Sequence, residues 1–360
     1  MNSLSLDQPA RAATWRPSRP AWVALSCALL LLASMIVSAG SGALPVSTRT
    51  TLETLWGGLR GHADGFDTIH AIVWQLRLPR VCMAALVGAS LGCSGAAMQG
   101  LFRNPLADPY LLGVASGASF GATVAMTLSG QLAVAFAEVP FTANHGAGVV
   151  PLFAFIGALA AVSATLLLTQ RRRRASTPSI LLGGIVVGSV LTSLTTYLMM
   201  RDADRLRAVF SWALGNLAAS DWSNVGRAAP YAAVGMLGLC ALARGLDALQ
   251  LGDDTARTLG VDATRIRLGV IVGASLSTAA AVSFVGIIGF VGLAAPHLAR
   301  RLGSVHHRLL LPTSALAGAL LLVLADLGAR VLIRPAELPV GVVTTVLGGP
   351  FFLWLLRRQQ

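Results

Sequence analysis

The chain has 360 residues, of which 55% are hydrophobic and only 12% are charged, and its formal net charge is +12. Soluble domains carry about 25% charged residues, so this composition is typical of a membrane protein. All 27 basic residues are arginines. The absence of lysine excludes a phosphate-binding GxxxxGK[ST] loop. The arginines lie in short segments between apolar runs, which indicates membrane orientation rather than a nucleic-acid partner.

Apolar segments that suit membrane-spanning helices recur along the whole chain. We expect about ten spans, at residues 21–40, 81–101, 109–128, 149–169, 179–200, 228–243, 266–285, 286–302, 309–332 and 339–356. The first is long for a signal-peptide core, so we interpret it as an uncleaved span. The expected fold is an all-α polytopic membrane protein with one transmembrane domain, 21–356, between short tails, 1–20 and 357–360. Several of its helices are short or broken by glycine.

The arginines also predict how the spans are oriented. When the spans alternate from a cytoplasmic N-terminus, most arginines fall on the inner side, and the run Arg171–Arg174 is the strongest anchor. Both termini and the polar segment 251–267 are then cytoplasmic. The expected localisation is the cytoplasmic (inner) membrane, with lipid as a partner.

The segment 251–267 lies between two long apolar runs and carries helix caps. Asp253 is expected to cap a short helix that Gly260 ends, and Asp262 to cap a second helix that continues into the next span. Two such helices suit contact with a soluble partner that moves the membrane part, although an ordinary capped loop is the alternative. The residues expected to make this contact are Asp253, Asp254, Arg257, Leu259, Gly260 and Val261.

Small, weakly polar residues form stripes along two spans. The stripes consist of Gly184, Gly188, Thr192 and Thr196 in one span and of Gly341, Thr344, Thr345 and Gly348 in the last span. Close helix packing is one interpretation, because glycine lets helices approach each other in lipid; Gly88 and Gly92 show the same spacing. The lining of a water-filled path for a large solute is the other.

Few residues in this chain suit chemistry inside a membrane. The four cysteines lie in apolar segments without CxxC spacing, and His306 and His307 have no third ligand nearby, so no metal site is expected. Asp326 is the one acid within an expected span, and Arg330 follows it by four residues, which favours a local ion pair. There is no HExxH and no convincing nucleophile–base pair, which argues against an enzyme. The lack of further buried acids makes an ion-coupled secondary transporter a distant alternative.

Three stretches together resemble one family. They are RLPRVCMAALVGASLGCSGAAMQGLFRNPLADPYLLGVASGAS at 77–119, the segment 251–267, and GIIGFVGLAAPHLARR at 286–301 followed by ELPVGVVTTVLGGPFF at 337–352. They resemble the membrane permease subunit of binding-protein-dependent, ATP-driven importers for iron–siderophores, haem and cobalamin, over about residues 65–356. The resemblance implies ten helices, a second permease subunit that is identical or different, two cytoplasmic ATPases that bind ATP and Mg²⁺, and an extracytoplasmic substrate-binding protein. No cofactor is implied in this chain.

The resemblance also assigns roles to particular residues. Arg77, Arg80 and Arg330 match outer positions where acidic residues of the binding protein dock, with anchoring of a helix at the interface as the alternative role. Asn104, Pro105 and Leu106 match a turn near the inner gate. The spans 179–200 and 339–356 correspond to those that line the path, and 251–267 corresponds to the segment that contacts the ATPase. Among substrates, iron(III)–siderophore is expected on family frequency, with cobalamin and haem as alternatives.

Overall fold

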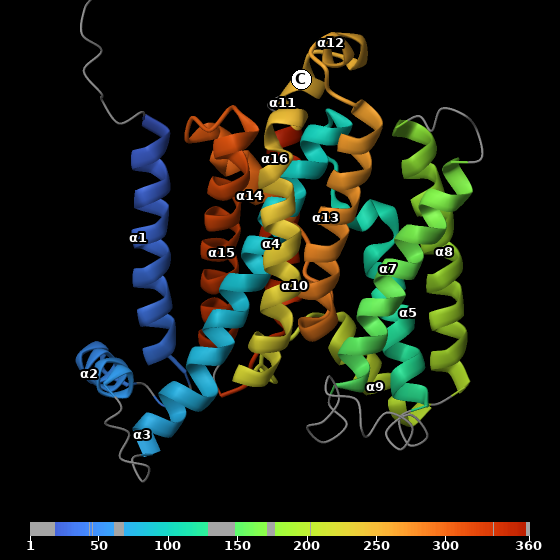
Figure 1. Ribbon diagram of the computed structural model, residues 1–360. Helices are drawn as coiled ribbons and strands as arrows, with labels where there is room; N and C mark the ends of the chain where they lie inside the picture. Colours follow the sequence, from blue (N-terminus) through green and yellow to red (C-terminus); the bar gives the residue numbers. More distant parts are fainter. Residues whose placement is uncertain are drawn as a thin grey trace, which may run out of the picture.

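The computed structural model describes residues 19–42, 44, 46–60, 68–128, 148–170, 177–201, 203–333 and 335–357. Within these ranges every regular element is a helix, and the long helices stand side by side in one bundle (Figure 1). The predicted all-α fold is confirmed. Of the two predicted tails, only residues 19, 20 and 357 are described, and the predicted anchor Arg171–Arg174 lies outside the described residues.

The long helices coincide with predicted apolar spans, because an uninterrupted apolar run satisfies its backbone hydrogen bonds within one helix. They are α1 (Arg19–Gly40), α4 (Leu78–Phe102), α7 (Val149–Gln170), α8 (Thr177–Arg201), α10 (Trp222–Ala241), α13 (Ala263–Val285), α15 (His307–Val331) and α16 (Val340–Arg357). In the described part of the chain, six helical stretches are long and apolar enough to cross a membrane. A bent pair, α10 with α11 (Ala243–Gln250), makes up to seven. The total of ten spans and the cytoplasmic position of both termini stay predictions.

Two predicted spans are interrupted in the structure. The span 109–128 begins with a 3-10 turn, Pro109–Leu112, and continues as α5 (Val114–Thr127) only after Gly113, whose φ is 88°. The prediction of a continuous span at 286–302 is wrong. Residues 286–290 are not helical, and α14 (Val291–Arg301) has 11 residues. A helix of that length rises about 16 Å, roughly half of the hydrocarbon thickness.

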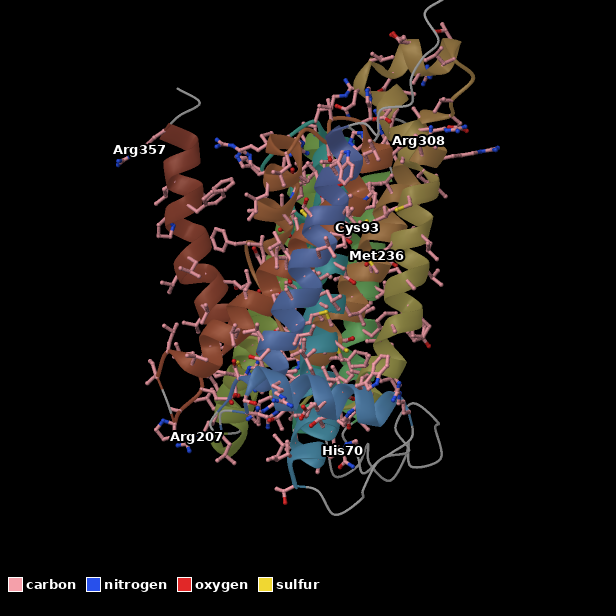
Figure 2. All side chains as sticks on the ribbon, turned by 90° about the vertical axis from the view of Figure 1, so that its left-hand side faces the viewer. His70, Cys93, Arg207, Met236, Arg308 and Arg357 are labelled. Atoms are coloured by element: carbon pink, nitrogen blue, oxygen red, sulfur yellow. The ribbon has the colours of Figure 1, made fainter. Side chains whose placement is uncertain are left out.

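Short helices mark the two ends of the bundle. At one end lie α2 (Thr48–Leu59), α3 (Thr68–Ala71), a π-helical stretch (Ile72–Arg77) and α9 (Ala203–Ala213); we call it the α2 end. At the opposite end, the α12 end, α11 leads into α12 (Asp253–Thr258), and α1 begins at this same end (Figure 1). Figure 2 places Arg357, the last residue of α16, at the α12 end and Arg207 of α9 at the α2 end.

The centre of the bundle forms around α4, which packs against α13, α14 and α15. Gly88 and Gly92 of α4 touch the backbone of α15 at Gly318 and Ser314, so closely that a Cβ at either glycine would collide with a carbonyl oxygen. This contact confirms the packing predicted from the Gly88 and Gly92 spacing. As a result, α4 is held firmly along its length and connects the two ends of the molecule.

Candidate functional site

The helix α12 projects from the bundle between two sharp turns. Gly252 precedes it with a φ of 110°, and Gly260 follows it with a φ of 77°. Glycine adopts this left-handed backbone without strain, so the predicted role of Gly260 as the helix stop is confirmed. Asp262 caps α13 by accepting hydrogen bonds from two backbone amides at 2.9 and 3.1 Å, also as predicted. The helix α13 then runs unbroken to Val285, so a long helix begins directly after the turn that follows α12.

Most of the predicted partner-contact residues are accessible. Leu259 is 60% exposed. Val261 is half-buried against the core. The other exposed members of the predicted set are Asp254, Arg257 and Gly260. The structure therefore offers a mixed polar and apolar surface at α12, although whether an ATPase binds there stays a prediction.

Asp253 has a different role from the one predicted. Gly252 occupies the cap position of α12, and no side chain caps this helix. The Asp253 carboxylate instead accepts two hydrogen bonds from Arg267 of α13, at 2.6 and 2.8 Å. The cap prediction is wrong because a long-range arginine provides a stronger, charge-assisted partner than the local amides do.

The 103–108 loop forms a tight turn directly beside this surface. The backbone N–H of Leu106 donates to Asn104 Oδ1 at 2.9 Å, and the N–H of Ala107 donates to the Asn104 carbonyl at 3.1 Å. Asn104 and Pro105 line a cavity of about 1030 Å³, and Leu259 lines the same cavity. The structure therefore brings two predicted gate residues and one predicted coupling residue, Leu259, to the same cavity, which their separation in sequence does not reveal.

Asp108 fixes the other end of this loop and was missed by the sequence analysis. Its Oδ1 accepts a hydrogen bond from the backbone N–H of Tyr110 at 2.8 Å, and the Tyr110 hydroxyl donates to the carbonyl of Ile288 at 3.0 Å. Burial raises the pKa of the Asp108 carboxyl to about 6, and the hydrogen bond from Tyr110 opposes that shift. The sequence signal for this role is the Asx-Pro pair at 108–109, which favours the start of a turn.

At the α2 end, Arg80 and Arg330 surround one buried carboxylate. Arg80 Nε donates to Asp326 Oδ1 at 2.9 Å, and Arg330 Nε lies 3.1 Å from Asp326 Oδ2. The predicted local pair between Asp326 and Arg330 is confirmed. A second acid, Glu337, approaches Arg80 Nη1 to 2.7 Å and is itself 40% exposed. A fully buried aspartate is thus compensated by two arginines, as a charge in a low-dielectric environment requires.

Arg77 and Arg330 also hold the last turn of α1. Arg77 donates to the carbonyls of Ala39 at 3.2 Å and Gly40 at 2.9 Å and to that of Leu44. Arg330 donates to the carbonyl of Ser41 at 2.8 Å. These contacts satisfy carbonyls that the helix end leaves without partners, and they place cations at the negative end of the helix dipole.

None of the three arginines predicted for docking is a free charge on the surface. Arg77, Arg80 and Arg330 are all buried and have partners within the chain. The physical reason is that distant segments supply the carbonyls and carboxylates that accept their hydrogen bonds. Docking of a partner at these arginines stays a prediction. A docking partner would first meet Glu337, which is exposed next to Arg80.

The predicted stripe on α8 divides into two parts. Gly184 is buried, and a Cβ there would collide with the Leu111 carbonyl, so this half of the stripe packs against the loop before α5. Gly188 is looser, with Ser116 Oγ 3.2 Å from the position of a Cβ. Thr192 and Thr196 are exposed and line a cavity of about 270 Å³ beside α9. Helix packing explains the first half of the stripe and leaves the second available for a path.

The stripe on α16 divides in a similar way. Gly341 packs closely against the carbonyls of Leu214 and Ile287. Thr344 is buried and lines an apolar cavity of about 250 Å³ between α14, α15 and α16. In this position Gly341 anchors the start of α16, and the path role of both residues stays a prediction.

The fold and these surfaces together define a polytopic membrane protein with a short helix that projects at one end. Within the described ranges, no group of three or more His, Cys, Asp and Glu side chains is arranged to hold a metal ion. The chain belongs to the FecCD transport family, whose model matches residues 30–358. It is thus a permease subunit of an ATP-binding-cassette importer for metal chelates in the cytoplasmic membrane. The ATPase of such an importer is a separate subunit, and an extracytoplasmic binding protein is a further partner.

Several characterised relatives are similar over most of their length. The cobalamin import permease BtuC of Halobacterium salinarum is 42% identical over 82% of this chain and 75% of its own. The hemin transport permease HmuU of Yersinia pestis is 39% identical over 92% of this chain and 94% of its own. The Fe(3+) dicitrate permease FecD of Escherichia coli is 37% identical, with 92% and 97% covered. A solved metal-chelate-type ABC transporter in an inward-facing conformation has a TM-score of 0.78 at 27% identity and covers 94% of this chain and 99% of its own.

Proposed function

We propose that this chain moves an iron(III)–siderophore inward across the cytoplasmic membrane by alternating access that a separate ATPase drives. One observation carries the mechanism of this proposal: the exposed surface at Leu259 shares a cavity with the gate turn at Asn104 and Pro105. The choice of substrate rests on family frequency. An ATPase that pushes on α12 therefore acts within reach of the turn that would close the path. Relatives named for cobalamin and hemin keep those two chelates as alternatives of the same type.

The proposed assembly contains a second permease subunit, identical or different. In support, α8 exposes large apolar side chains at Leu182, Val186 and Val190, and α16 exposes Val346 and Leu347. Surfaces of this kind suit another helix or lipid. The residues 21–356 form one transmembrane domain in this proposal, and ATP and Mg²⁺ bind to the two partner ATPases while this chain binds no cofactor.

A secondary transporter coupled to protons or sodium is less well supported. Such a mechanism uses an acid that exchanges its ion during transport. Asp326 is fully buried and is held by Arg80 and Arg330, so its charge is already compensated. This arrangement favours a fixed structural ion network over an exchangeable site.

The test is transport by the whole complex in proteoliposomes. The permease is co-expressed with its ATPase, reconstituted, and supplied with the binding protein on the substrate side. Uptake of an iron-55 siderophore, of cobalt-57 cobalamin and of haem is measured with and without internal ATP. ATP-dependent uptake of the siderophore alone is the expected result. Uptake of cobalamin or haem alone would replace the proposed substrate, and uptake driven by an ion gradient without ATP would reject the importer mechanism.

A further inference from the structure

Arg103 has an unusual backbone for an arginine. It ends α4 with a φ of 48° and a ψ of 38°, in the left-handed region that glycine normally occupies at a helix end. Apart from Phe290, it is the one non-glycine residue with positive φ in the described part of the chain. A strained backbone persists where surrounding contacts hold it, and such positions concentrate at functional sites. The contacts of the Arg103 side chain therefore indicate why arginine, rather than glycine, occupies this position.

This side chain connects α4 to the projecting segment at the α12 end. Its guanidinium donates a hydrogen bond to the carbonyl of Leu249, the next to last residue of α11, and lies 3.5 Å from Asp253 Oδ1 at the start of α12. A second tether runs parallel to it, because Gln250 Nε2 donates to the carbonyl of Gly100 at 2.7 Å. Two sets of contacts, one from Arg103 and one from Gln250, therefore connect the last turn of α4 to the α11–α12 junction.

Asp253 joins this tether to a long helix on the other side. Arg267 of α13 binds it with two hydrogen bonds, so one carboxylate lies between two arginines from different helices. All three side chains line a cavity of about 490 Å³, which Pro178 at the start of α8 also lines. The helices α4, α8, α11, α12 and α13 therefore meet at this charged cluster.

We propose that Arg103 is a positioning residue that transmits displacement of α12 to the 103–108 loop, with Asp253 as the shared contact. The inference rests on the proposed function and deepens it, because it names the link between the ATPase surface and the gate turn. Arg103 is the first residue of that turn, and Asn104 follows it directly. When α12 moves, its carboxylate pulls on the same residue that sets the direction of the loop.

Stability alone does not explain the cluster. The side chains of Arg103 and Asp253 are 44% and 39% exposed, and ion pairs at such exposure contribute little to folding. Glycine at this position would end α4 with less strain. Arginine is thus less favourable than glycine for the backbone at this position, and its side-chain contacts between α4 and α12 explain why it is present.

The experiment uses Arg103→Gly, which keeps the left-handed backbone and removes the guanidinium. In the reconstituted complex, ATPase co-purification and ATP hydrolysis should match the parent. Uptake per ATP hydrolysed should fall on the order of tenfold, in the lower range of measured coupling between sites. Asp253→Asn weakens both the Arg103 contact and the Arg267 contact, so uptake per ATP should fall in this variant as well. When it is combined with Arg103→Gly, the loss should be smaller than the product of the two single losses, because the two residues share a contact. Arg308→Ala is the control, since Arg308 is an exposed arginine at the α12 end (Figure 2).

A second measurement does not depend on the substrate. Hydrogen exchange at the backbone amides of Leu106 and Ala107 is followed when the ATPase binds. Binding should change this exchange in the parent and leave it unchanged in Arg103→Gly. Parent-like uptake per ATP and a parent-like exchange response in Arg103→Gly would overturn the inference, and so would loss of ATPase co-purification. If the parent complex transports no chelate but shows the exchange response through Arg103, the proposed function fails and the link remains.

Discussion

Arg80 and Glu337 form an ion pair of 2.7 Å between the start of α4 and the segment before α16, and Glu337 is the exposed member. A carboxylate from a docking partner would have to take the place of Glu337 to reach Arg80. The chain's own Glu337 therefore occupies the position that the family resemblance predicts for an acidic residue of the binding protein. The pair also lies next to buried Asp326, so its exchange would not leave Arg80 without a counter-charge.

The first prediction concerns Glu337. Glu337→Gln removes the competing carboxylate and leaves Arg80 paired with Asp326. Binding of the extracytoplasmic partner should tighten by about two- to fivefold, since partly exposed charge pairs are worth roughly 1 kcal/mol or less. The dissociation constant is measured at low salt, with the binding protein immobilised and the permease complex in solution. Glu53→Gln is the matched control, because Glu53 is an exposed acid paired within α2. Equal or weaker binding by Glu337→Gln would contradict the exchange.

A second prediction tests the structural role of Arg77. Arg77→Ala removes a donor from the carbonyls of Ala39 and Gly40 at the end of α1, and it leaves the Gly40 carbonyl with the backbone N–H of Val46. The free energy of unfolding should fall by about 1 to 3 kcal/mol, the usual cost of an unsatisfied buried polar group. Thermal unfolding in detergent measures it, with Arg207→Ala as a control because Arg207 is exposed. An unchanged melting temperature would show that Arg77 does not hold α1.

A third prediction concerns the buried carboxylate. Asp326→Leu leaves Arg330 with a buried, uncompensated charge and should lower the free energy of unfolding by about 3 to 5 kcal/mol. The double variant Asp326→Leu with Arg330→Leu should cost less than the single variant, because both charges disappear. Arg80 keeps Glu337 in both proteins. If the double variant is as unstable as the sum of the two single variants, the two residues do not act as a pair.

The two halves of the α8 stripe should respond differently to the same small change. Gly184→Ala places a methyl group against the Leu111 carbonyl and should cost about 1 to 3 kcal/mol through overpacking. Gly188→Ala meets only a side-chain oxygen, Ser116 Oγ at 3.2 Å, which can move slightly. The two variants are compared by thermal unfolding and by recovery from the membrane. Equal stability of both would show that Gly184 is not a packing contact.

The sequence predicts most of the fold because each long helix follows a local signal. Apolar runs predict α1, α13 and α15, and Asp262 and Gly260 predict the turns around α12 correctly. The break before α14 begins at Gly286, with a φ of 78°, and ends at Phe290, with a φ of 67°. The glycine permits such backbone, but an aromatic residue at the second position gives no sequence signal for it. Small residues suit both close helix packing and the lining of a water-filled path, so the stripe pattern alone does not distinguish these two roles.

The sites were harder to predict than the helices, because their contacts join distant parts of the chain. Arg77 binds carbonyls near residue 40, and Arg80 binds an acid near residue 330. A single sequence shows the arginines but not these partners, so they were interpreted as free surface charges. The link between Arg103 and Asp253 was missed for the same reason.

The last prediction concerns the surface at α12. Leu259→Asp places a charge where an apolar side chain, 60% exposed in this chain, is expected to fill a groove of the ATPase. Burying an unpaired carboxylate at an interface costs several kcal/mol, so co-purification of the ATPase should fall at least about tenfold and uptake should be lost. Binding of the extracytoplasmic partner should be retained, because Leu259 and the arginines at the α2 end lie at opposite ends of the bundle. Leu302→Asp is the matched control, since Leu302 is another exposed leucine, 45% exposed, in the turn after α14. Normal ATPase recovery with Leu259→Asp, or equal loss with Leu302→Asp, would mean that α12 is not the specific contact.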